Sequence, residues 1–553
     1  MPSFNEPVEP RVDPLQPVDE LLHWLVDTAL HVAIGMTIAL VAARLMRRAH
    51  LHWSWAALAL VLIVLLYGSL GAAALPLVVG AAGATRRGRR WHKEDLDSGA
   101  DLAEIAGRRH SPLTLLRSLP LTLDLRLRPG IATAGEREGE LLLGHDERGR
   151  SVAIPFGAQD GGRHALVVGA TGSGKTVTQT YMAVRAIERG MGAIVLDPKG
   201  DSDLRDRLRS AAMETGRPFM EWTPAGPCVY NPFAGGGETE VADKALAGER
   251  FTEPHYLRQA QRYLGHAVRA LRSGGIEVTL AGLVEVLDPD RLEDLARTLC
   301  EADAAPTFAY LDSLSTRQRN DLAGVRDRLA IMVESDVGRW LDPRRPGAER
   351  LDLPAAVRAR ATVYFGLESD RRPLLAAMLG AAIVQDLQTT VAALQGDPVA
   401  TMVVIDEFSA IAAEQVFRLF GRARSAGFSL LLGTQELSDL RPPGRERLLE
   451  QIMGNLSVLI AHRQVVPSSA ALIAELAGRR GVWRVTRSSD GRTTRTRTRE
   501  AALDPERIMG LAQGCAAVVV PGAPDGVRIA QVVSSQGPAP RPSAVVPNAE
   551  EEL

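Results

Sequence analysis

The stretch VVGATGSGKT at 167–176 restricts the possible folds of this chain more than any other feature. An apolar run, HALVVG, ends in this loop, and a helix-length segment separates the loop from a second apolar run, AIVLD at 193–197. Strand, glycine-rich loop, helix and strand in this order predict an α/β core with a parallel sheet. A loop of this kind holds a phosphate group between the end of the strand and the N-terminus of the helix.

Each position of the loop has a physical role in the predicted nucleotide site. Glycines let backbone N–H groups curl around the β-phosphate, Lys175 neutralises the β- and γ-phosphates, and Thr176 offers a hydroxyl to Mg²⁺. We therefore predict that the chain binds ATP with Mg²⁺. The predicted nucleotide-binding residues are Gly169, Ala170, Thr171, Gly172, Ser173, Gly174, Lys175 and Thr176.

Two further apolar runs end in side chains that suit the same chemistry. MVVIDEF at 402–408 predicts a buried strand that delivers Asp406 to the Mg²⁺ shell and Glu407 to the attacking water. The alternative is a strand end capped by solvated acids. FSLLLGTQ at 428–435 ends in Gln435, which either contacts both the water and the γ-phosphate or only stabilises a loop. The predicted catalytic residues are Lys175, Glu407 and Gln435, and the predicted metal ligands are Thr176 and Asp406.

Two arginine-rich stretches allow more than one interpretation. RLFGRARSAGF at 418–428 predicts a helix followed by a glycine turn, with arginines near the helix end. A guanidinium from this helix either enters a neighbouring subunit's site and offsets transition-state charge, or belongs to a solvated or DNA-facing surface. RRGVWRVTRSSDGRTTRTRTRE at 479–500 predicts a hairpin with one basic face, which either binds phosphates or protects a sheet edge by charge.

Two runs near the N-terminus, without Asp, Glu, Lys or Arg, predict membrane insertion. The first, at 28–43, is short for a span of about 20 residues, but the charged groups at its ends can snorkel. The second, at 56–84, is long enough to cross with a tilt. The basic cluster TRRGRRWHK at 85–93 favours the cytoplasmic side. This predicts a helical hairpin with both chain ends inside and residues 46–54 outside.

Three arginines oppose that hairpin. Arg44, Arg47 and Arg48 lie in the short connecting segment, so the hairpin places them outside, against the positive-inside rule. Either the second basic cluster overrides them, or the first run is not a true span. A single span is therefore the alternative.

The character of the chain changes between its apolar strands. From about 240 to 345, apolar residues follow i, i+3, i+4 spacing with few β-branched runs, which predicts an all-helical insertion. ELLLGHDERGRSVAIPF at 140–156 predicts a β-hairpin ahead of the loop. The predicted segments are 1–22 (acidic and Pro-rich), 23–84 (two transmembrane helices), 85–134 (basic juxtamembrane connector), 135–239 and 346–535 (the two parts of the ATPase domain), 240–345 (the helical insertion) and 536–553 (a disordered acidic tail).

Taken together, these features resemble one known family. Two N-terminal apolar runs precede GATGSGKT, and LDPKGD at 196–201 and YNPF at 230–233 follow it. After the helical insertion come VVIDEF and ARSAGFSLLLGTQELSDL at 423–440. This succession, over roughly 135–535, is similar to the type IV coupling proteins, the TraG/TraD group of conjugative transfer ATPases within the FtsK/HerA superfamily.

The resemblance implies a RecA-like P-loop domain that forms a homo-hexameric ring, with the helical domain at its cytoplasmic mouth. It implies an ATPase of the cell membrane that passes DNA, with an attached relaxase, to the channel proteins of a type IV secretion system. By the same resemblance, Arg424 is the expected arginine finger, with Arg463 as the second choice. The net charge of -2 excludes generic polyanion binding, so DNA contacts would come from local basic patches.

Three other functions remain as alternatives. The first is an FtsK-like DNA pump, which the absence of an appended winged-helix-like segment and the LDPKGD and YNPF positions argue against. The second is a protein-secretion ATPase, against which the single motor domain argues. The third is a receptor platform that uses ATP only to assemble. Glu407 and Gln435 argue against a platform, since a pure scaffold needs neither residue.

Overall fold

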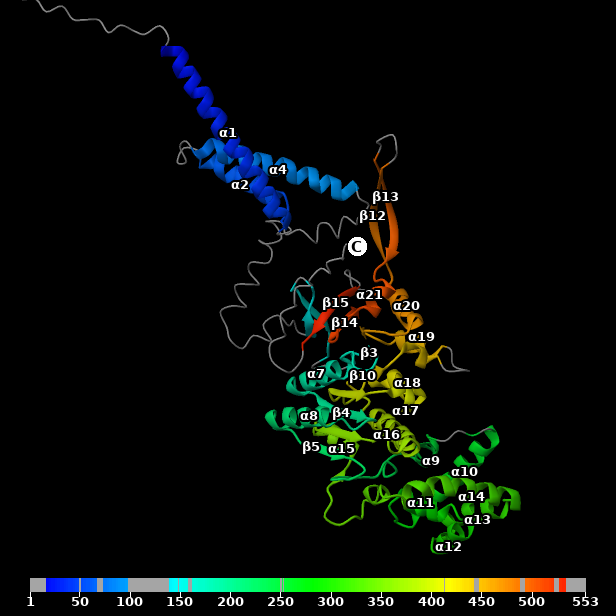
Figure 1. The fold of residues 1–553 in the computed structure, drawn as a ribbon. Helices are drawn as coiled ribbons and strands as arrows, with labels where there is room; N and C mark the ends of the chain where they lie inside the picture. The colour runs from blue at the N-terminus through cyan, green and yellow to red at the C-terminus, as the bar shows by residue number, and fades with distance from the viewer. Residues whose placement is uncertain are drawn as a thin grey trace, which may run out of the picture. The chain divides into compact units, whose positions relative to one another are not determined.

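The computed structural model describes residues 16–48, 51–66, 73–97, 139–147, 149–157, 162–248, 251, 253–411, 413–441, 447–487, 493–521 and 527–533 (Figure 1). The chain divides into two compact units. One unit is Met1–Ala134 with Arg479–Glu500, and the other is Gly135–Gly478 with Ala501–Leu553. The predicted tail at 536–553, most of the segment at 1–22 and the connector beyond residue 97 lie outside the described residues.

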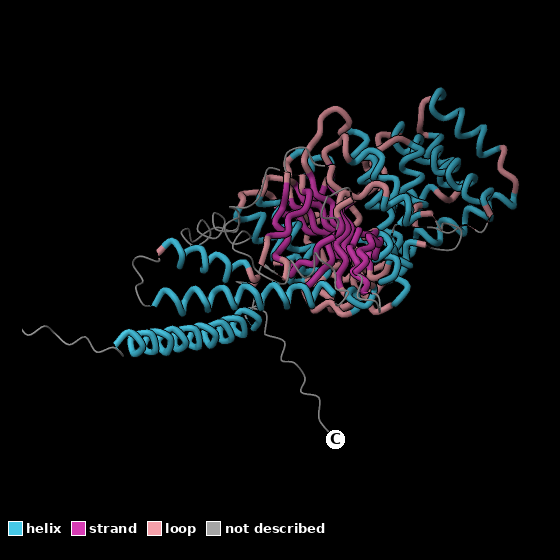
Figure 2. Tube along the Cα trace, turned by 90° about the horizontal axis from the view of Figure 1, so that it is seen from above, coloured by secondary structure: helices cyan, strands magenta, loops and turns pink. Residues whose placement is uncertain are grey.

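A twisted sheet forms the centre of the larger unit (Figure 2). Its strands are β1 (Glu140–His145), β2 (Ser151–Pro155), β3 (Ala165–Val168), β4 (Gly192–Asp197), β5 (Phe219–Trp222), β8 (Thr362–Gly366), β9 (Thr401–Ile405), β10 (Phe428–Thr434), β11 (Val458–His462), β14 (Cys515–Val519) and β15 (Val527–Val532). They lie in the order β2-β1-β15-β14-β11-β3-β10-β9-β4-β8-β5. Neighbours from β11 to β5 are parallel, and β14, β15, β1 and β2 join antiparallel. The predicted parallel core and the hairpin at 140–156 are confirmed.

The side chains of each central strand alternate between two apolar layers, because successive residues of a strand point to opposite faces. Ala165 and Val167 of β3 pack with α7 (Lys175–Glu188) and α8 (Ser202–Glu214), whereas Leu166 and Val168 pack in the layer of α16 (Pro373–Ala393). Both faces are therefore covered, as a parallel sheet requires. The other helices of this part are α15 (Leu353–Arg358), α17 (Phe408–Ile411), α18 (Ala413–Ala423), η3 (Leu437–Leu440), α19 (Leu448–Met453), α20 (Pro467–Leu476) and α21 (Pro505–Met509).

The predicted helical insertion is confirmed. It consists of α9 (Glu238–Leu246), α10 (Pro254–Ser273), α11 (Leu280–Val286), α12 (Pro289–Arg297), α13 (Glu301–Asp312), α14 (Thr316–Glu334) and η2 (Gly338–Trp340). Side chains of Thr279, Asp288 and Ser315 accept hydrogen bonds from backbone N–H groups at the starts of α11, α12 and α14. These N-caps satisfy donors that a helix start leaves unpaired and so fix where each helix begins.

A buried polar network joins the insertion to the sheet domain. Lys244 of α9 is completely buried and donates to Asp386 of α16 at 2.6 Å and to the carbonyls of Pro232 and Gly235 at 2.9 Å each. Tyr230, in the short parallel pair of β6 (Val229–Tyr230) and β7 (Arg350–Leu351), donates to the same Asp386 at 2.7 Å. The YNPF segment is therefore the place where the chain passes into the insertion.

The smaller unit contains α1 (Gln16–Arg48), α2 (Ser54–Leu65), α4 (Ala74–Asp97) and the hairpin of β12 (Arg479–Arg487) and β13 (Thr493–Ala501). The predicted basic hairpin at 479–500 is thus confirmed. α1 carries a stretch, Leu21–Met46, that is long and apolar enough to cross a membrane, with only 11% of its most apolar window buried. α16 passes the same test of length and composition, but 72% of that window is buried, so α16 is a core helix.

The predicted transmembrane hairpin is supported only in part. The first predicted span lies inside α1, but the run at 56–84 does not form one helix. α2 ends at Leu65 and α4 begins at Ala74. Gly68, Ser69 and Gly71 of this run lie outside the described residues. The predicted boundary between span and connector at residue 85 falls in the middle of α4, which continues to Asp97.

Candidate active site

The carboxyl ends of four neighbouring strands bring the predicted residues to one edge of the sheet. β3 leads into the glycine-rich loop, β4 ends at Asp197, β9 is followed by Asp406, and β10 is followed by Gln435. The register aligns these ends, since Val168 pairs with Thr434. Open α/β sheets bind their ligands at this edge.

The glycine-rich loop has the backbone shape that phosphate binding needs. Gly172 and Gly174 adopt φ values of 74° and 109°, in the left-handed region that favours glycine. α7 begins at Lys175, directly after the loop, so the N-terminus of the helix faces the loop. The hydroxyl of Ser173 is buried and has no hydrogen-bond partner among the described residues. These features fit a bound phosphate.

The four residues predicted for phosphate and water chemistry meet at this edge. Lys175 Nζ donates to Asp406 Oδ1 and, at 3.1 Å, to Glu407 Oε1. Gln435 Nε2 donates to the same Glu407 oxygen at 2.9 Å. Lys175, Asp406 and Glu407 are all buried. Asp406 and Glu407 are therefore not solvated strand-end acids.

Glu407 lies in an unusual backbone and electrostatic setting. Its φ is 46°, a conformation that a non-glycine residue rarely adopts and that the surrounding structure must hold in place. Burial alone would raise the pKa of Glu407, but Lys175, Gln435 and Lys199 together lower it below its usual range. Glu407 is therefore an ionised carboxylate held by three donors, which suits a group that orients and polarises water.

Lys199 is a site residue that the sequence analysis did not identify. Its Nζ donates to Glu407 Oε1 at 3.2 Å, and the charges of Glu407 and Asp406 raise the pKa of Lys199 although burial alone would lower it. Asp197 shapes the turn that carries it by accepting from the N–H groups of Lys199 and Asp201. The signal was present in LDPKGD, because a lysine two residues after a buried strand lies at the same sheet edge as the loop.

The space beside Asp406 fits a metal ion. Asp406 and the half-buried Thr176 supply oxygen atoms, which are the ligands that Mg²⁺ prefers. Gln179 of α7 is buried, and neither its oxygen nor its nitrogen has a hydrogen-bond partner among the described residues. Both side chains lie against Gly433, since a Cβ at that position would collide with Asp406 Oδ1 and Gln179 Nε2. An orphaned amide beside a buried carboxylate is a suitable place for an ion and its water.

Arg424 lies at the opposite edge of the sheet. It follows α18 in the turn before β10, and a Cβ at Gly162 would collide with its side chain. Its charge, after burial, is the second cause that lowers the pKa of His164 to about 4. All of β10 separates Arg424 from Gln435, which at the rise of a strand is about 23 Å for seven residues. The structure therefore does not bring Arg424 to the Lys175 of its own chain.

Arg463, by contrast, lies beside the loop of its own chain. Its carbonyl accepts from the N–H of Ala170 at 3.0 Å, and its buried Nε has no hydrogen-bond partner among the described residues. The two arginines that the sequence offered as fingers thus occupy opposite edges of the sheet. Of these two arginines, only Arg463 lies beside the glycine-rich loop of its own subunit.

His462 supports the loop from the adjacent strand. Burial lowers its pKa to about 4, so the ring is neutral. Its Nδ1 donates to the carbonyl of Cys515 at 3.0 Å, and its Nε2 accepts from the hydroxyl of Thr178 at 2.8 Å. A Cβ at Gly169 would lie 2.7 Å from the Cβ of His462. No sequence pattern points to His462, because β11 meets β3 only in the folded sheet.

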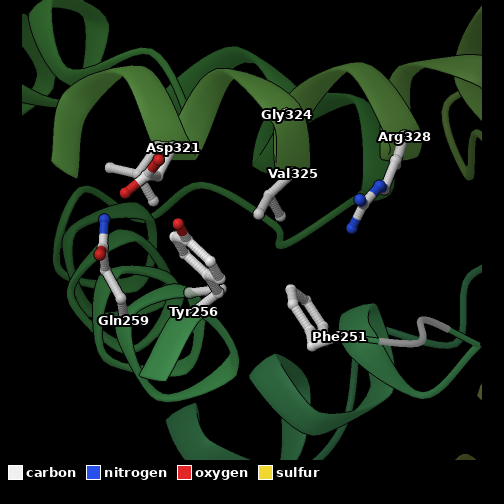
Figure 3. Close-up of a pocket in the computed structure, with 9 residues that line it drawn as sticks. Phe251, Tyr256, Gln259, Asp321, Gly324, Val325 and Arg328 are labelled. Atoms are coloured by element: carbon white, nitrogen blue, oxygen red, sulfur yellow. The ribbon is translucent and has the colours of Figure 1, made fainter. Parts of the chain in front are cut away.

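A separate cavity of about 230 Å³ lies in the helical insertion between α10 and α14 (Figure 3). Tyr256 and Gln259 face Asp321 and Arg328 across it. Its lining includes no glycine-rich loop and none of the residues predicted for nucleotide chemistry. We therefore assign it no part in phosphate binding.

Comparisons with known proteins match two regions of this chain to family models. Residues 400–513 match the family model described as the TraM recognition site of TraD and TraG, and residues 139–207 match the central domain of the helicase HerA. Over 91 residues the chain is 36% identical to the type 4 coupling protein DotL of Legionella pneumophila. That alignment covers 16% of this chain and 12% of DotL. The resemblance to the TraG/TraD group is thereby confirmed.

Solved structures support the fold. The unbound bacterial conjugative coupling protein TrwBdeltaN70 matches with a TM-score of 0.55 at 16% identity, over 74% of this chain and 90% of that chain. The plasmid coupling protein TrwB in complex with ADP and Mg²⁺ matches with a TM-score of 0.52 at 17% identity, over 74% of this chain and 98% of that chain. The larger unit therefore has the P-loop ATPase fold with a helical insertion that the sequence predicted.

Proposed function

We propose that this chain is a membrane-anchored ATPase that moves DNA toward a secretion channel. In this it would be like the type IV coupling proteins of the TraG/TraD group, which it matches in two regions. The observation that carries the ATPase assignment is the meeting of Lys175, Asp406, Glu407 and Gln435 at the carboxyl edge of the sheet. Such an edge binds nucleotide, and the lowered pKa of Glu407 keeps a carboxylate ready beside it.

The residues divide the work of phosphoryl transfer among them. The phosphates of ATP would compete with Asp406 and Glu407 for Lys175 Nζ, which leaves Glu407 free to accept a proton from the attacking water. Gln435 already contacts Glu407 and would orient the same water. Mg²⁺, held by Thr176 and Asp406, would neutralise charge that develops on the phosphate oxygens.

The DNA and membrane parts of the proposal rest on other features. The exposed arginines of α18, Arg418 and Arg422, offer local positive charge on a chain whose net charge is -2. The apolar stretch of α1 supplies the anchor. The proposed assembly is a homo-hexamer, and the proposed partners are a relaxase on the DNA and the channel proteins of a type IV secretion system.

The test is ATP hydrolysis by the purified full chain, with and without DNA. Lys175→Ala should lose hydrolysis, whereas Glu407→Gln should keep ATP binding and lose about 10²–10⁴-fold in turnover. Arg297→Ala, an exposed position of α12, is the matched control and should be unchanged. Wild-type turnover in Glu407→Gln would refute the site. Hydrolysis that DNA does not stimulate would reject DNA as the substrate and favour a protein-secretion ATPase.

A further inference from the structure

We propose that α2 and the apolar half of α4, residues 74–84, form a wedge that enters one leaflet of the membrane and leaves on the same side. α1 would then be the sole span, with its N-terminal end outside. The partner of the wedge is the hydrocarbon of the cytoplasmic leaflet. This inference rests on the proposed membrane anchor and adds its topology.

The direction of the helices is the first step. Gly35 of α1 lies against Val79 of α4, and four residues later Ala39 lies against Gly83. Residue numbers rise together along the contact, so α1 and α4 are parallel. The C-terminal half of α1, from Gly35 on, packs against α4. A crossing hairpin made of two helices would instead be antiparallel.

Small residues make this contact close and specific. Gly35, Ala39 and Ala43 recur every four residues on α1, and Gly80, Ala84 and Gly88 do the same on α4. A Cβ at Gly35 would lie 2.7 Å from the Cβ of Val79, and one at Gly83 would lie 2.7 Å from the Cβ of Ala39. Small residues at four-residue spacing allow such close packing of helices within membranes.

The depth of the wedge follows from where α4 begins. The carbonyl of Pro76, in the first turn of α4, adjoins Gly35, which lies near the middle of the apolar stretch Leu21–Met46. α2 has 12 residues, about 18 Å of helix, and residues 74–84 add about 16 Å. α2 and residues 74–84 are therefore each about half as long as a hydrocarbon core of about 30 Å is thick. Ala74 is completely buried, so protein already covers the first turn of α4.

The charges place both ends of the wedge on one side. Because α1 and α4 are parallel, Arg44, Arg47 and Arg48 come to the same level as the basic cluster at 85–93. Trp53, at the start of α2, lies at the same level, since the guanidinium of Arg89 is 4.4 Å from the centre of its ring. Basic residues mark the cytoplasmic side and tryptophans mark the interface. Residues 12–43 contain neither Lys nor Arg, which fits an external N-terminal end. The conflict with the positive-inside rule disappears.

The surface of α2 identifies its partner. Ala56 is the buried residue of this helix and Leu60 is half-buried, while the other leucines and the valines are exposed, up to 75% at Leu65. The helix is apolar on every side, and a helix of that kind belongs in a core or a membrane rather than in water. α1 likewise exposes many large apolar side chains, among them Leu30, Ile34 and Met36, so both helices of this unit suit lipid.

Cysteine labelling tests the topology. In full chains whose Cys228, Cys300 and Cys515 are replaced, single cysteines at Pro2, Ala49 and Leu65 are treated with a membrane-impermeant maleimide. We expect Pro2→Cys to react in intact cells and Ala49→Cys only in inverted vesicles. Leu65→Cys should react in neither until detergent is added. Met213→Cys is the matched control, because its side chain is 72% exposed in the ATPase unit, and it should react in inverted vesicles without detergent.

Each other outcome overturns the inference. Reaction of Ala49→Cys in intact cells would establish a crossing hairpin. Reaction of Leu65→Cys in inverted vesicles without detergent would put the wedge in water. Protection that persists in detergent would assign the surface to a second copy of the chain. If the chain were absent from the membrane fraction, the proposed anchor itself would fail, which fractionation shows before any labelling.

Discussion

Replacing Lys244 by Met should destabilise the junction between the helical insertion and the sheet domain. The side chain of Lys244 is completely buried and makes three hydrogen bonds, one of them to Asp386. The substitution leaves a buried carboxylate without its cation and two carbonyls without a donor. Removing one partner of a buried ion pair typically costs about 3–5 kcal/mol. We expect a loss of stability within that range and not above it, because Tyr230 still donates a hydrogen bond to Asp386 in the variant.

The loss of stability should also depend on pH, because Asp386 can take up a proton. Burial raises the pKa of Asp386 in the folded chain even with Lys244 present, and the substitution raises it further. The folded variant then binds a proton that the unfolded chain releases at about pH 4. The penalty is therefore full above the folded pKa and shrinks as the pH falls toward the unfolded value. It should be larger at about pH 8 than at about pH 5.5.

Pulse proteolysis of the full chain in urea measures this penalty for the insertion. Adding Asp386→Asn to Lys244→Met should recover part of the stability and remove the pH dependence, because the amide still accepts from Tyr230 without a charge. Arg297→Met, which breaks an exposed pair with Glu293, is the control and should cost under about 0.5 kcal/mol. A Lys244→Met penalty below about 1 kcal/mol, or one equal at both pH values, would refute the reasoning about a buried, unpaired carboxylate.

Two further predictions concern the ATPase site. Arg424→Ala should lose hydrolysis but keep ATP affinity. Mixing it with Lys175→Ala subunits should partly restore activity, because some interfaces then pair an intact arginine with an intact loop. Unchanged hydrolysis in Arg424→Ala alone would shift the finger assignment to Arg463. Lys199→Met should move the acid limb of the turnover–pH profile to higher pH, because Lys199 helps to lower the pKa of Glu407. An acid limb at the same pH as in the wild type would show that Lys199 does not set the charge of Glu407.

The sequence predicted the ATPase core well because local patterns determine it. A buried strand before GATGSGKT and another before Asp406 and Glu407 can be read from apolar runs, and their parallel alignment then follows from the fold class. Lys199 and His462 were missed for different reasons. Lys199 lay inside a motif that had been noted without a role, whereas His462 acquires its contacts only because β11 pairs with β3.

The membrane segment was predicted less well. Apolar composition indicates whether a helix is more stable in lipid or in water, but it does not indicate the direction in which the helix runs. The run at 56–84 has enough apolar residues to cross, and composition cannot distinguish one crossing helix from two shorter ones. The information lay in the spacing of small residues around Gly35 and Gly80, which determines how close α1 and α4 can approach. Arg44, Arg47 and Arg48, which oppose the predicted hairpin, were a second signal. They fit the positive-inside rule only when α1 and α4 are parallel.

The position of Arg424 has a consequence for assembly. The glycine-rich loop lies at the carboxyl edge of the sheet and Arg424 at the opposite edge, so one subunit cannot bring them together. For Arg424 to reach Lys175, the amino edge of one sheet must face the carboxyl edge of the next. Such an interface joins two different surfaces and is therefore head-to-tail, and head-to-tail interfaces close into rings when the rotation between subunits allows it. A finger role for Arg424 and a two-fold dimer as the active form are thus incompatible, and the mixing experiment on Arg424 also tests the ring.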